Sequence, residues 1–346
     1  MPFGSGVIQH MNYAQTVGSP PVNLAEPRVR IYQLELPLSA LWPQEKKYDW
    51  SLLENWLNRW TVGGKRATVC VKFVPSGQEN SPWAAGCLPA WLAARVQTVT
   101  VNFGTPQVWP VVWDPAFQAL FAEFVQAFAR RYDGDDRVEW VLIGTGVFCS
   151  SKAAPPPVFN DPGQALQQAG YTDANFFNGC LQIAQTYANA FSKTWLMFGT
   201  SEYVNGQRIE MQGFDHLTLA KEVVGLAVPS GATRPKVGLF YHNLRGTDNW
   251  KLGPWPAALA ALSQQSPLAL GLDNAASASA QEQQIYGNPI TTAQYGFGGG
   301  STGIPPLPTD YYELYADDVS AAVAYNQNYQ PDFDTALTWL AQKVDV

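Results

Sequence analysis

The sequence predicts an α/β fold, a single (β/α)8 TIM barrel with long strand-to-helix loops, on three observations. Short apolar runs rich in β-branched and aromatic residues alternate with amphipathic helical runs, the pattern of a parallel sheet covered by helices. Eight strand-like runs occur, which is the number that closes such a barrel. The length of 346 residues suits one barrel, and no linker-like stretch or internal repeat divides residues 1–346 into further domains.

The predicted strands are short runs separated by helical or polar segments. They lie at Gly6–His10, Val29–Leu36, Ala67–Val74, Val138–Gly144, Trp195–Gly199, Lys236–Tyr241, Leu268–Leu272 and Thr292–Phe297. The segment after the last of them, Gly298–Pro308, is rich in glycine and proline. We therefore interpret it as a loop and not as a domain boundary.

Start and stop signals mark the helices between these strands. Asp49 places an acid at the beginning of one helix, and Gly63-Gly64 ends it. Asp114 precedes Pro115, which occupies a first-turn position of the next helix, where the missing N–H of proline is tolerated. Further helices are predicted at about Asp173–Ser192, Phe214–Leu226, Trp255–Ser263 and Phe333–Lys343.

The charge content limits the classes of partner. Only 14% of the residues are charged, the formal net charge is −7 and no run of Lys or Arg occurs, so nucleic acid is not an expected partner. No apolar run reaches the roughly 18 residues that span a bilayer, and membrane insertion is not expected. The weakly charged, amide-rich composition favours an extracellular or cell-surface location, although no signal peptide is visible at the start. Nothing in the sequence indicates an oligomeric state.

The sequence contains no motif for a metal or a cofactor, and we expect neither. The cysteines Cys70, Cys87, Cys149 and Cys180 form no CxxC pair, which excludes a zinc ribbon or a thioredoxin-like motif. The three histidines lack metal-ligand spacing, and no P-loop, GxSxG or strand-linked GxGxxG motif is present. Cys87 and Cys149 both follow predicted strands, where they either form a disulfide or remain as thiols.

Two stretches carry scaffold motifs. The first contains Leu41-Trp42-Pro43, Tyr48-Asp49-Trp50-Ser51-Leu52-Leu53 and Gly64-Lys65-Arg66-Ala67-Thr68-Val69. The second contains Trp113-Asp114-Pro115-Ala116-Phe117, Ala129-Arg130-Arg131-Tyr132-Asp133-Gly134-Asp135 and Val138-Glu139-Trp140-Val141-Leu142-Ile143-Gly144. Over about residues 30–150 they resemble the retaining glycoside hydrolase barrels related to β-galactosidases and cellulases. The resemblance implies a β-linked oligosaccharide or polysaccharide as substrate.

The sequence departs from that family at two functional positions. Trp42 stands where the family has the glutamate of its L-E-P motif. After the fourth strand the family carries its general acid/base glutamate, whereas Thr145–Lys152 contains no carboxylate and the next one is Asp161. A retaining glycosidase needs a protonated carboxylic acid for the leaving oxygen and a second carboxylate ~5–5.5 Å away as nucleophile. The acid is therefore missing from its expected place.

Glu202 and Asp273 are the candidate catalytic carboxylates. Asp273 follows the predicted seventh strand, where the resemblance places the nucleophile; if the strand count slips by one, the corresponding segment is Thr292–Gly300, which holds no acid. Glu202 lies just past the fifth strand. Active sites of this fold lie at the carboxyl ends of the strands, which supports both positions. The alternative for each is a loop-capping or solvated carboxylate.

Several aromatic and polar residues are candidates for binding sugar. The chain has 13 tryptophans, and flat indoles stack on the apolar faces of sugar rings. The alternative is that these tryptophans pack between the helices of the barrel. Trp83, Trp91 and Trp109 belong to the long segment between the third and fourth strands. Trp91 lies in a P-x-W-L sequence that borders the sugar cleft in the family that the chain resembles. His242 and Asn243 end the sixth strand and form a potential hydrogen-bonding pair.

Two further ionisable residues, Glu35 and His10, are not assigned a role in function. Glu35 lies inside a predicted strand, where we expect a buried salt bridge with Lys72 or Arg30. His10 is too isolated in the sequence to interpret.

Three hypotheses about function follow. The protein is a glycoside hydrolase with displaced carboxylates, a degenerate barrel that binds glycan without cleaving it, or a structural or assembly protein that kept the fold. The scaffold resemblance favours the first hypothesis. The missing glutamate favours the second and third, and implies reduced activity.

Overall fold

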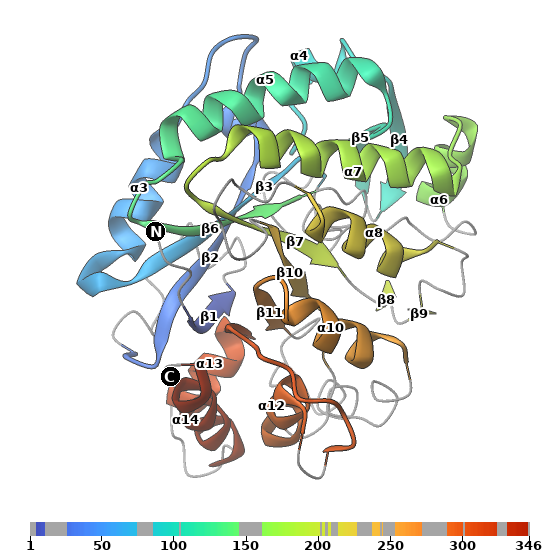
Figure 1. The fold of residues 1–346 in the computed structure, drawn as a ribbon. Helices are drawn as coiled ribbons and strands as arrows, with labels where there is room; N and C mark the ends of the chain where they lie inside the picture. The colour runs from blue at the N-terminus through green and yellow to red at the C-terminus, as the bar shows by residue number, and fades with distance from the viewer. Residues whose placement is uncertain are drawn as a thin grey trace.

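A closed barrel of eight parallel strands forms the centre of the structure (Figure 1). The computed structural model describes residues 5–10, 26–74, 86–103, 105–144, 161–200, 203–204, 207–208, 214–226, 237–242, 244, 253–271, 289–299, 302–323 and 331–344. Around the barrel the strand order is β1, β2, β3, β6, β7, β10, β11 and β12, and β12 pairs with β1 to close it. Helices surround the strands (Figure 1). The predicted (β/α)8 barrel is therefore confirmed.

The elements follow the chain in alternation. The barrel strands are β1 (Gly6–His10), β2 (Val29–Pro37), β3 (Arg66–Lys72), β6 (Val138–Ile143), β7 (Trp195–Thr200), β10 (Val237–Tyr241), β11 (Leu268–Gly271) and β12 (Tyr311–Tyr315). The helices are α2 (Leu38–Leu41), α3 (Ser51–Trp60), α4 (Ala90–Ala93), α5 (Pro115–Tyr132), α6 (Asp161–Gln168), α7 (Asp173–Ala190), α8 (His216–Val224), α10 (Trp255–Ser263), α12 (Pro289–Phe297), α13 (Ala316–Val323) and α14 (Pro331–Val344), with a 3-10 turn at Val62–Gly64. In the described part of the chain, two antiparallel pairs lie outside the barrel sheet: β4 (Thr98–Phe103) with β5 (Thr105–Pro110), and β8 (Tyr203–Val204) with β9 (Gln207–Arg208).

Seven of the eight predicted strands are barrel strands, but the eighth is wrong. The segment Thr292–Phe297 belongs to helix α12, and the strand that closes the barrel is Tyr311–Tyr315. The run Thr-Ala-Gln-Tyr-Gly-Phe at 292–297 has strand composition, but its buried positions Thr292, Ala293, Tyr295 and Gly296 have helical spacing. Pro289 stands at the start of the helix, where its fixed φ suits the first turn.

Side chains that point into the barrel form their own apolar cluster, separate from the larger core between the strands and the helices. It consists of Ile8, Ile31, Cys70, Trp140, Leu142, Met197, Phe240, Ala269 and Tyr311. Side chains alternate across a strand, so residues two positions further along each strand point to the same interior. This alternation identifies which residues lie at the carboxyl ends of the strands and face inward.

The residue in the L-E-P position belongs to the outer core. Trp42 is fully buried, and its ring centroid lies 4.6 Å from that of Trp91, 5.7 Å from Phe124 and 5.8 Å from Tyr48. Phe124 belongs to helix α5, so Trp42 packs the segment after β2 against α5. Trp42 therefore contributes packing where the resembled family has a carboxylate.

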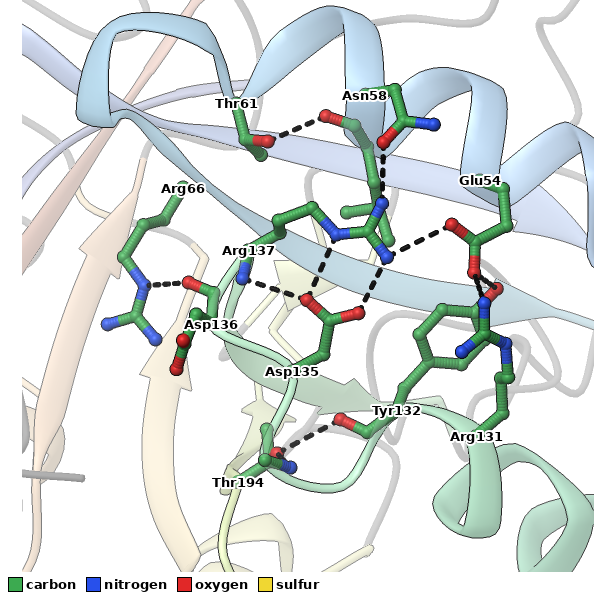
Figure 2. Close-up of polar contacts among 12 residues, drawn as sticks. Glu54, Asn58, Thr61, Arg66, Arg131, Tyr132, Asp135, Asp136, Arg137 and Thr194 are labelled. Atoms are coloured by element: carbon green, nitrogen blue, oxygen red, sulfur yellow. Dashed lines mark hydrogen bonds and ion pairs between the residues drawn. The ribbon is translucent and has the colours of Figure 1, made fainter.

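The second scaffold motif forms a polar network at the amino-terminal side of the barrel (Figure 2). The guanidinium of Arg137 donates to the Asp135 carboxylate at 2.7 Å and to the Asn58 side chain at 2.7 Å, and it lies 3.0 Å from the Glu54 carboxylate. Glu54 also accepts from the hydroxyl of Tyr132 at 3.2 Å. The network joins helix α3 to the turn between α5 and β6, so the motif stabilises the scaffold at the end opposite the carboxyl ends of the strands.

Asp133, in the same turn, holds the segment that leads into β7. Its carboxylate accepts from the backbone N–H groups of Ser192, Lys193 and Thr194 at 2.7–2.8 Å and from the Ser192 hydroxyl at 2.7 Å. Partial burial by itself raises the pKa of Asp133. The hydrogen bonds from Thr194, Ser192 and Lys193 outweigh burial, and the net pKa is below its ordinary value.

We expect Asp133→Asn to lower the free energy of unfolding by about 1–3 kcal/mol at neutral pH, because the donors lose a charged acceptor. Because the folded-state pKa is lowered, this stabilisation is present above the unfolded pKa of about 3.9 and is lost as the pH falls through the folded-state pKa. Urea unfolding between pH 7 and pH 3 measures both effects. Asp136→Asn, at an exposed position of the same turn, is the control and should change the free energy of unfolding little at neutral pH. A deficit for Asp133→Asn that stays constant with pH would contradict the assigned role.

Candidate functional site

Among the residues that the structure describes, five ionisable side chains gather at the mouth of the barrel, the end where the strands have their carboxyl termini. They are His10, Glu35, Lys72, His242 and Glu313, and we call them the mouth cluster. Each lies two or four positions beyond a residue of the interior apolar cluster, on the same face of its strand or directly after it. Active sites in this fold lie at this end of the barrel.

Glu313 of β12 links two histidines from different strands. Its Oε1 lies 3.0 Å from Nδ1 of His10, the last residue of β1, and its Oε2 lies 3.7 Å from Nδ1 of His242, which follows β10. Nε2 of Gln33 lies 2.9 Å from the same Nδ1 of His10. The Glu313 side chain is 0% exposed, whereas that of His10 is 13% exposed. The histidine thus lies between a buried carboxylate and the mouth.

The protonation of His10 depends on this carboxylate. Burial lowers the pKa of an imidazole, because it penalises the charged form. The charge and the hydrogen bond of Glu313 act in the opposite direction, and the net pKa of His10 is raised above its ordinary value. His10 therefore carries a proton over a wider pH range than an isolated histidine does.

Glu35 and Lys72 form a second buried pair beside the first. Their side chains are 10% and 7% exposed, and the Lys72 ammonium contacts the Glu35 carboxylate, so of the two partners expected for Glu35, Lys72 or Arg30, the structure confirms Lys72. Cys70 lies below Lys72 on the same face of β3 and is fully buried. Burial, reinforced by the charge of Glu35, raises the pKa of the Cys70 thiol well above its ordinary value, so this cysteine is not a nucleophile at neutral pH.

A glycine makes room for the Glu313 carboxylate. A Cβ atom built on Gly271 of β11 would lie 2.6 Å from Glu313 Oε2 and 3.1 Å from a ring carbon of Phe240. These approaches are too close for any side chain without displacement of a neighbour. Glycine at position 271 therefore leaves the space that the Glu313 carboxylate occupies.

The structure places some of the predicted site residues and leaves others untested. His242 lies at the mouth as expected and is 3% exposed. Trp91 of α4 is partly buried and donates its Nε1–H to the Trp42 carbonyl at 3.1 Å. Trp109 of β5 is 1% exposed and donates to the Gln107 side chain, so its ring has no face available for stacking on a sugar. Glu202, Asp273, Trp83 and Asn243 lie outside the described residues.

The predicted disulfide is likewise untested. Cys87 is buried at 4% exposure, and Cys149 lies outside the described residues. Pairing of Cys87 with Cys149 stays a prediction.

Within the described part of the chain, no helix is both long enough and apolar enough to cross a membrane.

Sequence reasoning missed the residues that organise the mouth cluster. Glu313 was not considered because its strand was assigned elsewhere, and His10 was left without a partner. The available signal was the segment Tyr-Tyr-Glu-Leu-Tyr at 311–315, which places one carboxylate on the interior face of an aromatic strand.

The closed barrel with a charged mouth belongs to the (β/α)8 class, and its fold is like that of glycoside hydrolases. The catalytic domain of a β-amylase from Paenibacillus polymyxa superimposes with a TM-score of 0.62 at 9% identity, covering 98% of each chain. A thermostable mutant of a xylanase from Cellvibrio japonicus superimposes with a TM-score of 0.53 at 12% identity, covering 100% of this chain and 99% of the xylanase chain. No protein-family model and no curated protein matches the sequence. At these identities the likeness shows the fold alone.

Proposed function

We propose that this protein binds a β-linked oligosaccharide or polysaccharide at the barrel mouth and is a carbohydrate-active barrel of the glycoside hydrolase type. The observation that carries the proposal is the mouth cluster, which places buried charged groups from β1, β2, β3 and β12 at the end of the barrel where this fold binds its ligands. Burying charges is costly, and apolar residues of similar volume often fill such positions at no loss of stability. Charged residues at this end therefore favour a ligand-binding role.

The fold and the scaffold motifs support a carbohydrate as the ligand. Solved structures with this fold include a β-amylase and a xylanase, and residues 30–150 carry motifs that resemble glycosidase barrels. Glu202 and Asp273 remain the proposed catalytic carboxylates, and Trp83 and Trp91 the proposed stacking residues. We propose one domain over residues 1–346.

Binding without cleavage is the second candidate function. One sequence observation favours it: no carboxylate stands between Thr145 and Lys152, directly after β6, which the structure confirms as the fourth strand. A barrel that keeps its charged mouth but lacks a positioned acid retains affinity and loses most of its rate.

Glycan binding should depend on the charged side chains of the mouth cluster and not on buried ion pairs elsewhere in the protein. We expect the double variant Glu35→Gln/Lys72→Met to weaken binding of a β-linked oligosaccharide by about tenfold or more, because charged hydrogen-bonding partners at a site contribute about 1.5–3 kcal/mol. Titration calorimetry with gluco-, xylo- and manno-oligosaccharides measures this loss.

A matched control exists at the other end of the barrel. Arg66 begins β3 and contacts the buried carboxylate of Glu139 on β6, which also accepts from the Tyr311 hydroxyl. Glu139→Gln/Arg66→Met likewise replaces a carboxylate and its cationic partner by neutral side chains, away from the proposed site. We expect it to bind as the unchanged protein does. Equal losses from both double variants, or no binding of any glycan by the unchanged protein, would contradict the proposed function.

A further inference from the structure

The His10–Glu313 pair is the part of the mouth cluster that is built to present a hydrogen-bond donor. We propose that His10 binds the ligand directly: Glu313 holds Nδ1 of the imidazole, and Nε2–H donates to a hydroxyl or ring oxygen of the glycan. The inference rests on the proposed function and names the residue that recognises the sugar. It assigns to Glu313 a positioning role.

The geometry leaves one ring nitrogen for a ligand. Nδ1 of His10 lies 3.0 Å from Oε1 of Glu313 and 2.9 Å from Nε2 of Gln33. This nitrogen therefore faces side chains of the barrel interior. His10 is the last residue of β1 and keeps 13% of its side chain exposed. Because the two nitrogens lie on opposite sides of the imidazole, engagement of Nδ1 by the interior directs Nε2 away from it.

The ring is also held in one orientation. The centroid of the Tyr315 ring lies 4.6 Å from that of His10, with 33° between the planes. Glu313 is held in turn by its complete burial and by its contacts with the imidazoles of His10 and His242. A donor that is fixed before the ligand arrives loses little entropy on binding, which favours a recognition role.

The surrounding charges favour a protonated His10. Glu313 of β12 and Glu35 of β2 act on it as anions, Lys72 of β3 acts as a cation, and His242 lies on the far side of the Glu313 carboxylate. Burial lowers the pKa of His10, but the two carboxylates outweigh burial and Lys72, and the net pKa is raised. An imidazolium is a stronger donor than a neutral ring, so glycan binding should be strongest below the raised pKa and should weaken as the pH rises through it.

Two substitutions of His10 separate the roles of its nitrogens. The side-chain nitrogen of His10→Asn occupies about the place of Nδ1, so this variant keeps a donor to Glu313 and loses the one directed at the ligand. His10→Gln reaches about as far as Nε2 and keeps a donor at the ligand position, but it cannot titrate. We expect about a tenfold loss of glycan affinity for His10→Asn, and near-normal affinity without pH dependence for His10→Gln.

The histidine resonances give a readout that a structural role would not change. The chain has three histidines, and burial lowers the pKa of His216 to about 3, which removes it from the neutral range. NMR titration of the Hε1 signals should show His10, assigned with His10→Gln, titrating above its ordinary pKa of 6.5. Glu313→Gln should move the midpoint down, because the charge of Glu313 raises the pKa of His10, and added β-linked oligosaccharide should move it up in the unchanged protein.

The outcomes distinguish the two proposals. Glycan binding by the unchanged protein with no shift of the His10 signal, or with full affinity in His10→Asn, would overturn the role of His10 and leave the proposed function intact. Absence of binding would overturn the proposed function and this inference together. If Glu313→Gln fails to fold, the two His10 variants and the ligand-induced shift in the unchanged protein still decide the question.

Discussion

Hydrolysis of aryl β-glycosides by this protein should be very slow or undetectable. A positioned general acid contributes about 10²–10⁴-fold to the rate of such reactions, and the residues from Thr145 to Lys152 offer no carboxylic acid after the fourth barrel strand. An activated aryl leaving group needs less protonation than an alkyl group, so aryl substrates are the ones on which any remaining nucleophile would be detected. Release of the aryl alcohol, followed by absorbance, measures the rate.

If Asp273 is the nucleophile, aryl substrates should react measurably while alkyl glycosides do not, and Asp273→Asn should abolish the reaction. Asp273 follows β11 by two residues, and β11 is the seventh strand, so the strand count on which this assignment rests is confirmed. Phe148→Glu or Ser150→Glu should then raise the rate on alkyl glycosides, because each places a carboxyl in the segment after β6. Brisk cleavage of an unactivated glycan by the unchanged protein would show that another element supplies the acid.

The parts of the fold that could be predicted from the sequence depend on local pattern. The helices at 51–60 and 115–132 were predicted from amphipathic runs that each follow an aspartate, and Pro115 marks the start of the second; all of these signals act within a few residues. The Glu35–Lys72 pair could be anticipated because β2 and β3 are consecutive strands that lie side by side. The closing strand at 311–315 could not, because a six-residue run of strand composition at 292–297 fitted the expected number of strands equally well.

The candidate site depends on contacts between distant parts of the chain. His10 and Glu313 are 303 positions apart and meet only because β1 and β12 pair when the barrel closes. Nothing near His10 in the sequence indicates its partner, so the histidine appeared isolated. The burial of Trp109 has a similar origin: it follows from a β4–β5 hairpin within a segment that was interpreted as a ligand-binding loop.

The mouth cluster should make the protein sensitive to the loss of a single charge. Lys72→Met leaves the Glu35 carboxylate, with a side chain 10% exposed, beside Cys70 without its ammonium partner. Removing one member of a buried pair typically costs 3–5 kcal/mol, because the remaining charge stays desolvated. We expect a loss of about that size in the free energy of unfolding, measured by urea denaturation.

The double variant Glu35→Gln/Lys72→Met should recover most of that loss, since neither side chain is then charged. The same protein should bind glycan poorly, as argued for the barrel mouth. Restored stability without restored binding would indicate that the Glu35–Lys72 pair serves the ligand and not the fold. If the double variant is as unstable as Lys72→Met alone, the instability comes from lost packing of the lysine stem, and the pair is a structural part of the barrel.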